Sequence, residues 1–301
     1  MTGIYSRHYQ GDDAYHRLRS FLTEIYPLVT PNVYCTVGDL DWWRGIDDDQ
    51  NAILSARLWF DDDKRVVGFV WPWPKQRQVD LIVHPDYRAC EPEMLEWAEQ
   101  SAKERDPGSE GAVVSTWSFA KDEVRQALLR ERGYERQNGF FAFRGRPLAA
   151  KVPMAGLPTG YALRHFRGEE DIERRVAVHR DAFAPSRMTA AKHRAVMRSP
   201  SYRPELDLVV EAPDRSFAAF SIVWFDDVNR IGVFEPVGTH AAHRRRGLGR
   251  AMMFEGMRRL RNLGAETAHV NSWLADGPAA ALYDSVGLTV LDRNHEWRKV
   301  I

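Results

Sequence analysis

The chain has 301 residues, which is enough for two domains of ordinary size because one hydrophobic core rarely organises more than about 250–300 residues. Hydrophobic residues make up 44% of it, but no run approaches the ~18 consecutive apolar residues of a membrane span, so we expect no membrane partner. Lysine plus arginine equals aspartate plus glutamate at 42 each, so no overall field attracts nucleic acid, and we expect none as a partner.

Residues 1–11 mix charged and polar side chains without an apolar stretch, which argues against a secretory signal peptide and favours the cytoplasm. The two cysteines, Cys35 and Cys90, fit a reducing compartment. No cluster of histidine and cysteine has the spacing of zinc ligands. We therefore expect no structural metal.

The N-terminal half alternates strands and helices. Its patterns predict strands at 65–71 and 78–83, a turn at 84–88, a helix at 92–105, a strand at 111–116, a helix at 122–132 and a strand at 139–143. The segment 148–159 then combines small residues with Pro and Gly and has no periodicity, which is typical of a linker. We place the domain boundary there, giving domains 1–150 and 151–301.

The C-terminal half begins with predicted helices at 171–183 and 190–197, followed by an antiparallel meander of strands at 206–210, 217–225 and 231–239. From 248 to 263 the period changes: Met253, Met257 and Leu260 recur at helical spacing, and Gly264 supplies a stop. A strand at 267–270, a helix at 278–286 and a closing strand pair through Trp297 complete the domain.

The two halves repeat one order of elements and share local sequence. Residues 115–117 (Ser-Thr-Trp) parallel 271–273 (Asn-Ser-Trp), and residues 128–134 parallel 282–288. An internal duplication is the economical explanation. We therefore predict an α/β (α+β) fold of two tandem domains, each a mixed, mainly antiparallel central sheet flanked by helices.

The chemistry concentrates at residues 244–250, where a strand runs into a basic, glycine-containing turn that opens a helix. The first amides of a helix have no intrahelical acceptor, and the helix dipole places partial positive charge there. Gly247 and Gly249 let a diphosphate approach the backbone, and the arginines add charge. The pattern by itself also fits a solvated basic start of a helix.

The spacing Arg-x-x-Gly-x-Gly, filled by Arg244, Gly247 and Gly249, is followed about thirty residues later by Ala-x-x-Leu-Tyr-x-x-x-Gly-Leu. This combination resembles the GNAT superfamily of acetyl-CoA-dependent N-acetyltransferases, over residues ~205–301. The resemblance implies two GNAT-like domains and acetyl-CoA as cosubstrate, with no metal. The Gly-x-Gly-x-x-Gly fingerprint of dinucleotide-binding proteins is absent.

The resemblance also implies which residues hold the cofactor. Backbone groups of the strand before the loop would bind the pantetheine arm and thioester carbonyl, and the loop amides would bind the pyrophosphate. The family often has Asn where Asp276 stands, so Asn271 is an alternative cofactor contact. The implied cofactor-binding residues are Val237, Thr239, Arg244, Arg245, Arg246, Gly247, Leu248, Gly249, Arg250, Asn271 and Asp276.

Two residues are candidates for proton transfer. In the family a tyrosine on the later helix protonates the departing thiolate, and Tyr283 matches it; the alternative is a half-buried helix aromatic. Glu235 is our candidate base for the amine, because its strand parity matches Val237 and Thr239; the alternative is a surface glutamate at a bulge made by Pro236. His240 and His243 are rival bases, although their place beside the loop favours a solvent or phosphate role.

The N-terminal half resembles the family as a degenerate copy, because carboxylates at Glu91 and Glu93 replace the glycines of the loop, and Leu129 stands in place of Tyr283. This tandem arrangement is similar to that of mycothiol synthase. We predict an N-acetyltransferase that moves an acetyl or acyl group from acetyl-CoA to a primary amine, preferably of a small molecule, by direct attack. The alternative is a non-catalytic acyl-CoA-binding sensor or scaffold. Monomer and homodimer both remain open.

Overall fold

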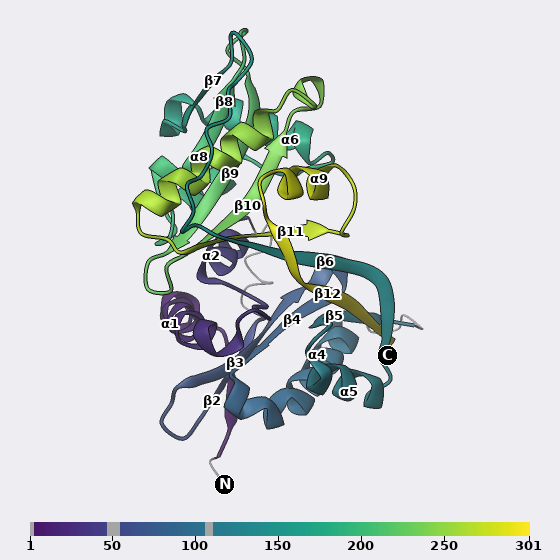
Figure 1. The fold of residues 1–301 in the computed structure, drawn as a ribbon. Coiled ribbons are helices and arrows are strands. Elements are labelled where there is room, and N and C mark those ends of the chain that lie inside the picture. Colours follow the sequence, from purple (N-terminus) through teal and green to yellow (C-terminus); the bar gives the residue numbers. More distant parts are fainter. Residues whose placement is uncertain (1–2, 47–54, 106–110) are drawn as a thin grey trace. The chain divides into compact units, whose positions relative to one another are not determined.

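The computed structural model describes residues 3–46, 55–105 and 111–301 (Figure 1). Contacts between residues divide the chain into two compact units. Unit 1 holds the described residues of Met1–Thr36, Asp47–Ala142 and Asp292–Ile301, and unit 2 holds Val37–Ile46 and Phe143–Leu291. Each unit is described by itself.

Three segments cross the boundary that the sequence suggested at residue 150, because Val37–Ile46 and residues 143–150 lie in unit 2 and Asp292–Ile301 lies in unit 1. Helix α2 (Val37–Ile46) belongs to unit 2, where a Cβ on Gly38 would lie 2.4 Å from the Cβ of Trp224, and where Asp41 accepts a hydrogen bond from the Ser201 amide at 3.0 Å. Strand β12 (Thr289–Val300) ends in unit 1. The predicted closing strand pair is wrong: β12 is one continuous strand, and its residues from Asn294 to Val300 pair with β5.

Unit 2 is built on a sheet whose strands lie in the order β6-β11-β10-β9-β8-β7. Strands β8 to β10 form the predicted antiparallel meander. Strand β7, which the sequence did not predict, pairs antiparallel with β8, whereas β10 and β11 are parallel. The strands are β6 (Glu135–Pro147, whose last five residues lie in unit 2), β7 (Ala162–His165), β8 (Asp207–Glu211), β9 (Phe217–Asp226), β10 (Ile231–Thr239) and β11 (Thr267–Trp273). The helices after the linker are α6 (Ile172–Ala182), α7 (Ala190–Met197), α8 (Leu248–Asn262) and α9 (Pro278–Ser285), with short 3-10 turns η3 (Gly168–Glu170), η4 (Pro204–Leu206) and η5 (Ala241–His243).

Helix α8 covers one face of this sheet (Figure 1). Its buried face carries Met253, Met257 and Leu260 at the spacing the sequence predicted. Gly256 faces the ring of Phe234 so closely that an added Cβ would lie 2.7 Å from it. The close contact fixes α8 against β10, and the N-terminus of α8 therefore has a defined position beside the end of that strand.

Unit 1 repeats the same order of elements. Its strands lie in the order β1-β2-β3-β4-β5-β12-β6, with β3 and β4 antiparallel and β4 and β5 parallel. They are β1 (Tyr5–His8), β2 (Arg57–Phe60), β3 (Val66–Trp73), β4 (Gln78–Val83) and β5 (Val113–Phe119), with helices α1 (Gly11–Val29), α4 (Glu91–Arg105) and α5 (Glu123–Glu131) and turns η1 (Pro74–Gln76) and η2 (Pro85–Cys90). The predicted fold class and the tandem repeat are confirmed.

Candidate active site

Strand β10 separates from its parallel neighbour before it ends. The two strands pair over Ile231–Val233 of β10, although β10 continues to Thr239 and β11 continues to Trp273. The last residues of β10 stay paired with β9 on the other side. Because β10 stays paired with β9 but not with β11, its backbone N–H and C=O groups on the β11 side are open to a ligand. This is the geometry expected for binding a pantetheine arm.

A bulge interrupts β10 at the candidate base. The pairing with β9 jumps by three residues on β10, from Phe234 to Val237, against two on β9, so one residue is extra. The extra residue shifts the alternation of faces at a point between Phe234 and Val237. Glu235 is half-buried, and its carbonyl oxygen accepts a hydrogen bond from Trp224 Nε1 at 2.7 Å.

The loop 244–250 has the features of an anion cradle. Gly247 adopts φ +77°, a left-handed conformation that favours glycine. The first intrahelical bond of α8 runs from the Ala251 amide to the Gly247 carbonyl at 3.0 Å, so the amides of Leu248, Gly249 and Arg250 precede it and have no acceptor within the helix. Gly249 is also tight, because an added Cβ would lie 3.1 Å from Leu282.

A cavity of about 530 Å³ lies between this loop, the end of β10 and helix α9. Of the predicted site residues it is lined by Val237, Thr239, Arg244, Arg245, Gly247, Leu248, Gly249, Arg250 and Tyr283. The cavity therefore brings together the end of the separated strand, the anion cradle and the candidate proton donor. Such a set of groups fits a coenzyme A thioester, whose diphosphate needs the amides and arginines and whose pantetheine arm needs an open strand.

Four predicted residues lie outside the lining of this cavity: Glu235, Arg246, Asn271 and Asp276. Arg246, Asn271 and Asp276 are exposed to solvent. Asn271 lies on β11 after the segment paired with β10 ends, and its neighbours Val270 and Ser272 are buried.

Both histidines of the turn are engaged by neighbouring side chains. His240 Nε2 lies 3.5 Å from an oxygen of Asp181, whose other oxygen accepts the Ala241 amide at 2.6 Å. His243 Nδ1 lies 2.9 Å from the hydroxyl of Tyr161, and His243 lines the cavity. These contacts give the histidines a part in shaping the loop.

Tyr283 and Glu235 lie within electrostatic reach of each other. Burial, and secondly the negative charge of Asp39 on α2, together raise the pKa of Glu235 to about 8. Tyr283 is 6% exposed; burial raises the pKa of its phenol, the charge of Glu235 raises it again, and Arg144 lowers it. A neutral phenol and a carboxyl group that titrates near neutrality are suited to donating and accepting protons.

Sequence reasoning missed three residues that act on this site: Asp39, Asp181 and Arg144. Asp39 reaches unit 2 through α2, which is distant from β10 in sequence. Arg144 directly follows the predicted strand at 139–143 and is fully buried in the structure, although charged side chains are rarely buried. Asp181 lies at the end of α6, where no local pattern links it to the loop.

The corresponding end of β4 in unit 1 has no cradle. Glu91, which begins α4, is fully buried; its carboxylate lies 2.7 Å from Arg88 Nε and 3.2 Å from Arg125 Nε. Arg88 also contacts Asp122 at 2.8 Å, and a cavity of about 510 Å³ lies beside these groups. A carboxylate of the chain itself thus takes the place where a bound anion would need these arginines.

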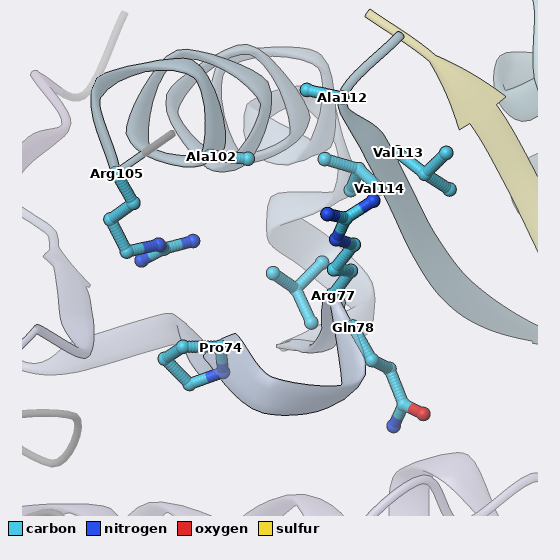
Figure 2. A pocket seen from close by; sticks show the side chains of 9 residues that line it. Pro74, Arg77, Gln78, Ala102, Arg105, Ala112, Val113 and Val114 are labelled. Carbon is cyan, nitrogen blue, oxygen red and sulfur yellow. The ribbon is translucent and has the colours of Figure 1, made fainter. Parts of the chain in front are cut away.

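A second cavity of unit 1, of about 410 Å³, lies at the opposite ends of the same strands (Figure 2). Figure 2 shows Arg77 and Arg105 reaching it from different elements, with Pro74 and Ala102 on its walls. Arg105 is the last residue of α4, and a cation there complements the negative end of the helix dipole. That role accounts for the charge without a bound anion.

Within the part of the chain that the structure describes, no helix is long and apolar enough to cross a lipid bilayer. Across residues 3–46, 55–105 and 111–301, no three His, Cys, Asp or Glu side chains are grouped so that they could hold a metal ion.

Comparisons with known proteins agree with this geometry. The sequence model of the acetyltransferase (GNAT) family matches residues 173–288. A mycothiol acetyltransferase from Pseudarthrobacter chlorophenolicus is 27% identical over 225 residues, which cover 71% of this chain and 67% of that relative.

Two solved structures share the fold over nearly the whole chain. A GCN5-related N-acetyltransferase from Sphaerobacter thermophilus has a TM-score of 0.70 at 18% identity, covering 99% of this chain and 95% of its own. A tandem GNAT protein from the clavulanic acid biosynthesis pathway has a TM-score of 0.68 at 16% identity, covering 100% and 98%. Residues 173–288 are therefore similar to the acetyltransferase (GNAT) family, and the chain as a whole has the fold of a tandem GNAT protein.

Proposed function

We propose that unit 2 transfers the acetyl group of acetyl-CoA to the primary amine of a small molecule by direct attack. The observation that carries the proposal is the single cavity shared by the amide cradle, the separated end of β10 and Tyr283. The coenzyme supplies an activated thioester. The chain's own groups bind its diphosphate, orient the thioester along β10 and move the protons.

Different parts of the site bind different parts of acetyl-CoA. The amides of Leu248, Gly249 and Arg250, with the side chains of Arg244 and Arg250, hold the diphosphate. Backbone groups of Val237 and Thr239 fix the pantetheine arm and thioester carbonyl. Asn271 and Asp276 are left as exposed positions that a cofactor could contact only at its periphery.

Proton transfer follows from the two titrating groups. Glu235, as a carboxylate, removes a proton from the neutral acceptor amine as that amine attacks, directly or through a water molecule. The amine nitrogen forms a bond to the acetyl carbon, and the bond from that carbon to sulfur breaks with its electron pair leaving on sulfur. Tyr283 gives its hydroxyl proton to that sulfur, so the products are an amide and the free thiol of coenzyme A. The proton held by Glu235 then returns to the Tyr283 phenolate and restores both groups.

The relatives favour a small-molecule acceptor, because the 27%-identical protein is named for mycothiol. The proposed acceptor is therefore a small molecule with a primary amine.

The test is a release assay for free coenzyme A with a panel of amines, run on the intact chain and on Tyr283→Phe. We expect Tyr283→Phe to lose about 10²-fold or more in kcat while its acetyl-CoA affinity stays within about twofold. Turnover that is unchanged in Tyr283→Phe would contradict the proton-donor role. Binding of acetyl-CoA without turnover in either protein would instead indicate a sensor or scaffold.

A further inference from the structure

Arg144 is a fully buried arginine on the part of β6 that lies in unit 2. Its guanidinium donates to Ser272 Oγ at 3.2 Å, to the Ala275 carbonyl at 3.3 Å, to Asp284 Oδ1 at 2.5 Å and to the Leu288 carbonyl at 3.1 Å. These acceptors lie at the end of β11, before α9, on α9 and after it. One side chain therefore joins both ends of α9 to the sheet.

Helix α9 depends on such anchoring. It has eight residues, and an isolated helix of that length is unstable in water. It nevertheless forms one wall of the cofactor cavity, through Pro278, Ala279, Ala281, Leu282 and Tyr283. The position of the Tyr283 hydroxyl is thus set by what holds α9 in place.

A second arginine of β6, Arg146, holds the same end of α9. It donates to the Val286 carbonyl at 2.5 Å and lies on the same face of β6 as Arg144, while a Cβ on the intervening Gly145 would lie 2.6 Å from Leu291. Arg146 therefore shares the anchoring role of Arg144. It is not among the charges that act on Tyr283.

Arg144 differs from Arg146 because its charge acts on Tyr283. Two charges act on Tyr283 from neighbouring elements: Glu235 on β10, which disfavours the phenolate, and Arg144 on β6, which favours it. The counterion of Arg144, Asp284, is on α9 itself and its side chain is 63% exposed, so water screens it. A buried cation in a fixed position stabilises negative charge that develops nearby during a reaction.

We propose that Arg144 is a positioning residue for proton donation by Tyr283: it fixes α9 and holds a positive charge beside the phenol as its proton passes to the departing sulfur. The inference rests on the proposed role of Tyr283. It also means that a residue outside the segment 173–288, which matches the GNAT family, completes the site.

The test compares Arg144→Met, Arg144→Lys and the control Arg146→Met in the full chain. The substrates are acetyl-CoA and its selenoester analogue, whose selenolate leaves without needing a proton donor. With acetyl-CoA we expect Arg144→Met to lose about tenfold or more in kcat, with KM for the coenzyme within about twofold, and Arg144→Lys to recover part of the loss. With the selenoester, Arg144→Met should approach the parent chain.

Arg146→Met removes a smaller anchor, one hydrogen bond to the Val286 carbonyl, and a charge that does not act on Tyr283, so it should affect both substrates equally and weakly. An equal loss of kcat for the thioester and the selenoester in Arg144→Met would reduce Arg144 to a structural anchor and overturn the proposal, as would full activity. If Arg144→Met does not fold, as judged by its thermal transition, the thioester and the selenoester are compared in Arg144→Lys instead. Lysine keeps the charge but not the four contacts, and an equal loss of kcat for both substrates would again overturn the proposal.

Tyr283→Phe separates this inference from the proposed function. If Tyr283→Phe turns over acetyl-CoA normally, the proton-donor role itself fails. If Tyr283→Phe is impaired and is rescued by the selenoester, but Arg144→Met is not rescued, the role of Tyr283 stands and the inference on Arg144 alone fails.

Discussion

The pH dependence of acetyl transfer should report the state of Glu235. Its pKa of about 8, against an ordinary value of 4.5, leaves about one molecule in ten with a charged Glu235 at pH 7. Because the carboxylate is the form that accepts a proton, kcat should rise as the pH rises through about 8. Glu235→Gln should lose this rising limb and about 10²-fold or more in kcat.

Asp39→Asn should move that limb toward lower pH. Removing the neighbouring negative charge lowers the pKa of Glu235, although burial, the larger cause, remains. A shift of one pKa unit would bring the charged fraction at pH 7 from about one in ten to about one in two, so the rate there would rise about fivefold. The assay is coenzyme A release between pH 6 and 9.5 at saturating acetyl-CoA.

Two controls separate Glu235 from other titrating groups. Asp227→Asn removes one charge from an exposed side chain of the same unit, at 70% exposure, and should leave the limb in place. Repeating the profile with a second amine of different pKa distinguishes titration of the acceptor from titration of the enzyme. A limb that follows the amine, or that stays fixed in both Asp39→Asn and Glu235→Gln, would refute the assignment of Glu235 as the base.

The remaining predictions concern packing and charge. Gly238→Ala places a Cβ 2.5 Å from the ring of Phe220, so it should lower the free energy of unfolding by about 1–3 kcal/mol in urea titrations, whereas Gly156→Ala, which meets no atom within 4 Å, should change it by much less. Glu91→Gln should destabilise unit 1 by about 3 kcal/mol in thermal or urea unfolding, because it leaves the buried Arg125 without its nearest carboxylate. Wild-type stability in Glu91→Gln would contradict the buried ion pair.

Local patterns predicted the elements that position the cofactor site. The strand at 231–239 and the helix at 190–197 match the structure, and α8 ends one residue before its predicted end. These succeeded because a change of hydrophobic period and a glycine stop are properties of neighbouring residues. The basic loop was recognisable for the same reason, since Arg244, Gly247 and Gly249 are close in sequence.

What the sequence could not show are contacts between distant segments. Nothing near Val37–Ile46 indicates that α2 packs in unit 2, because its partners Trp224 and Ser201 are more than 150 residues away. The end of β12 pairs with β5, which is distant in sequence, so nothing near β12 indicates this pairing. The bulge between Phe234 and Val237 likewise depends on the register of β9, so simple alternation along β10 could not show it.

The sequence also could not show which charges act on the candidate proton-transfer groups. The pKa of Glu235 and the influence of Arg144 on Tyr283 depend on burial and on groups from other elements. Glu91 and Glu93 were expected to disable the N-terminal loop, and their neighbours were not foreseen: Glu91 contacts Arg88 and Arg125, and Glu93 accepts a hydrogen bond from Trp59 at 3.0 Å.

The central claim is that the amide cradle of unit 2 binds acetyl-CoA, and calorimetry of the intact chain, Gly249→Glu and Asn262→Glu tests it most directly. Gly249→Glu puts bulk against Leu282 and a negative charge into the cradle, whereas Asn262→Glu puts the same charge at the far, exposed end of α8. We predict one molecule of acetyl-CoA bound per chain, with binding abolished in Gly249→Glu and retained in Asn262→Glu. No binding to the intact chain, or equal binding to all three proteins, would contradict the account.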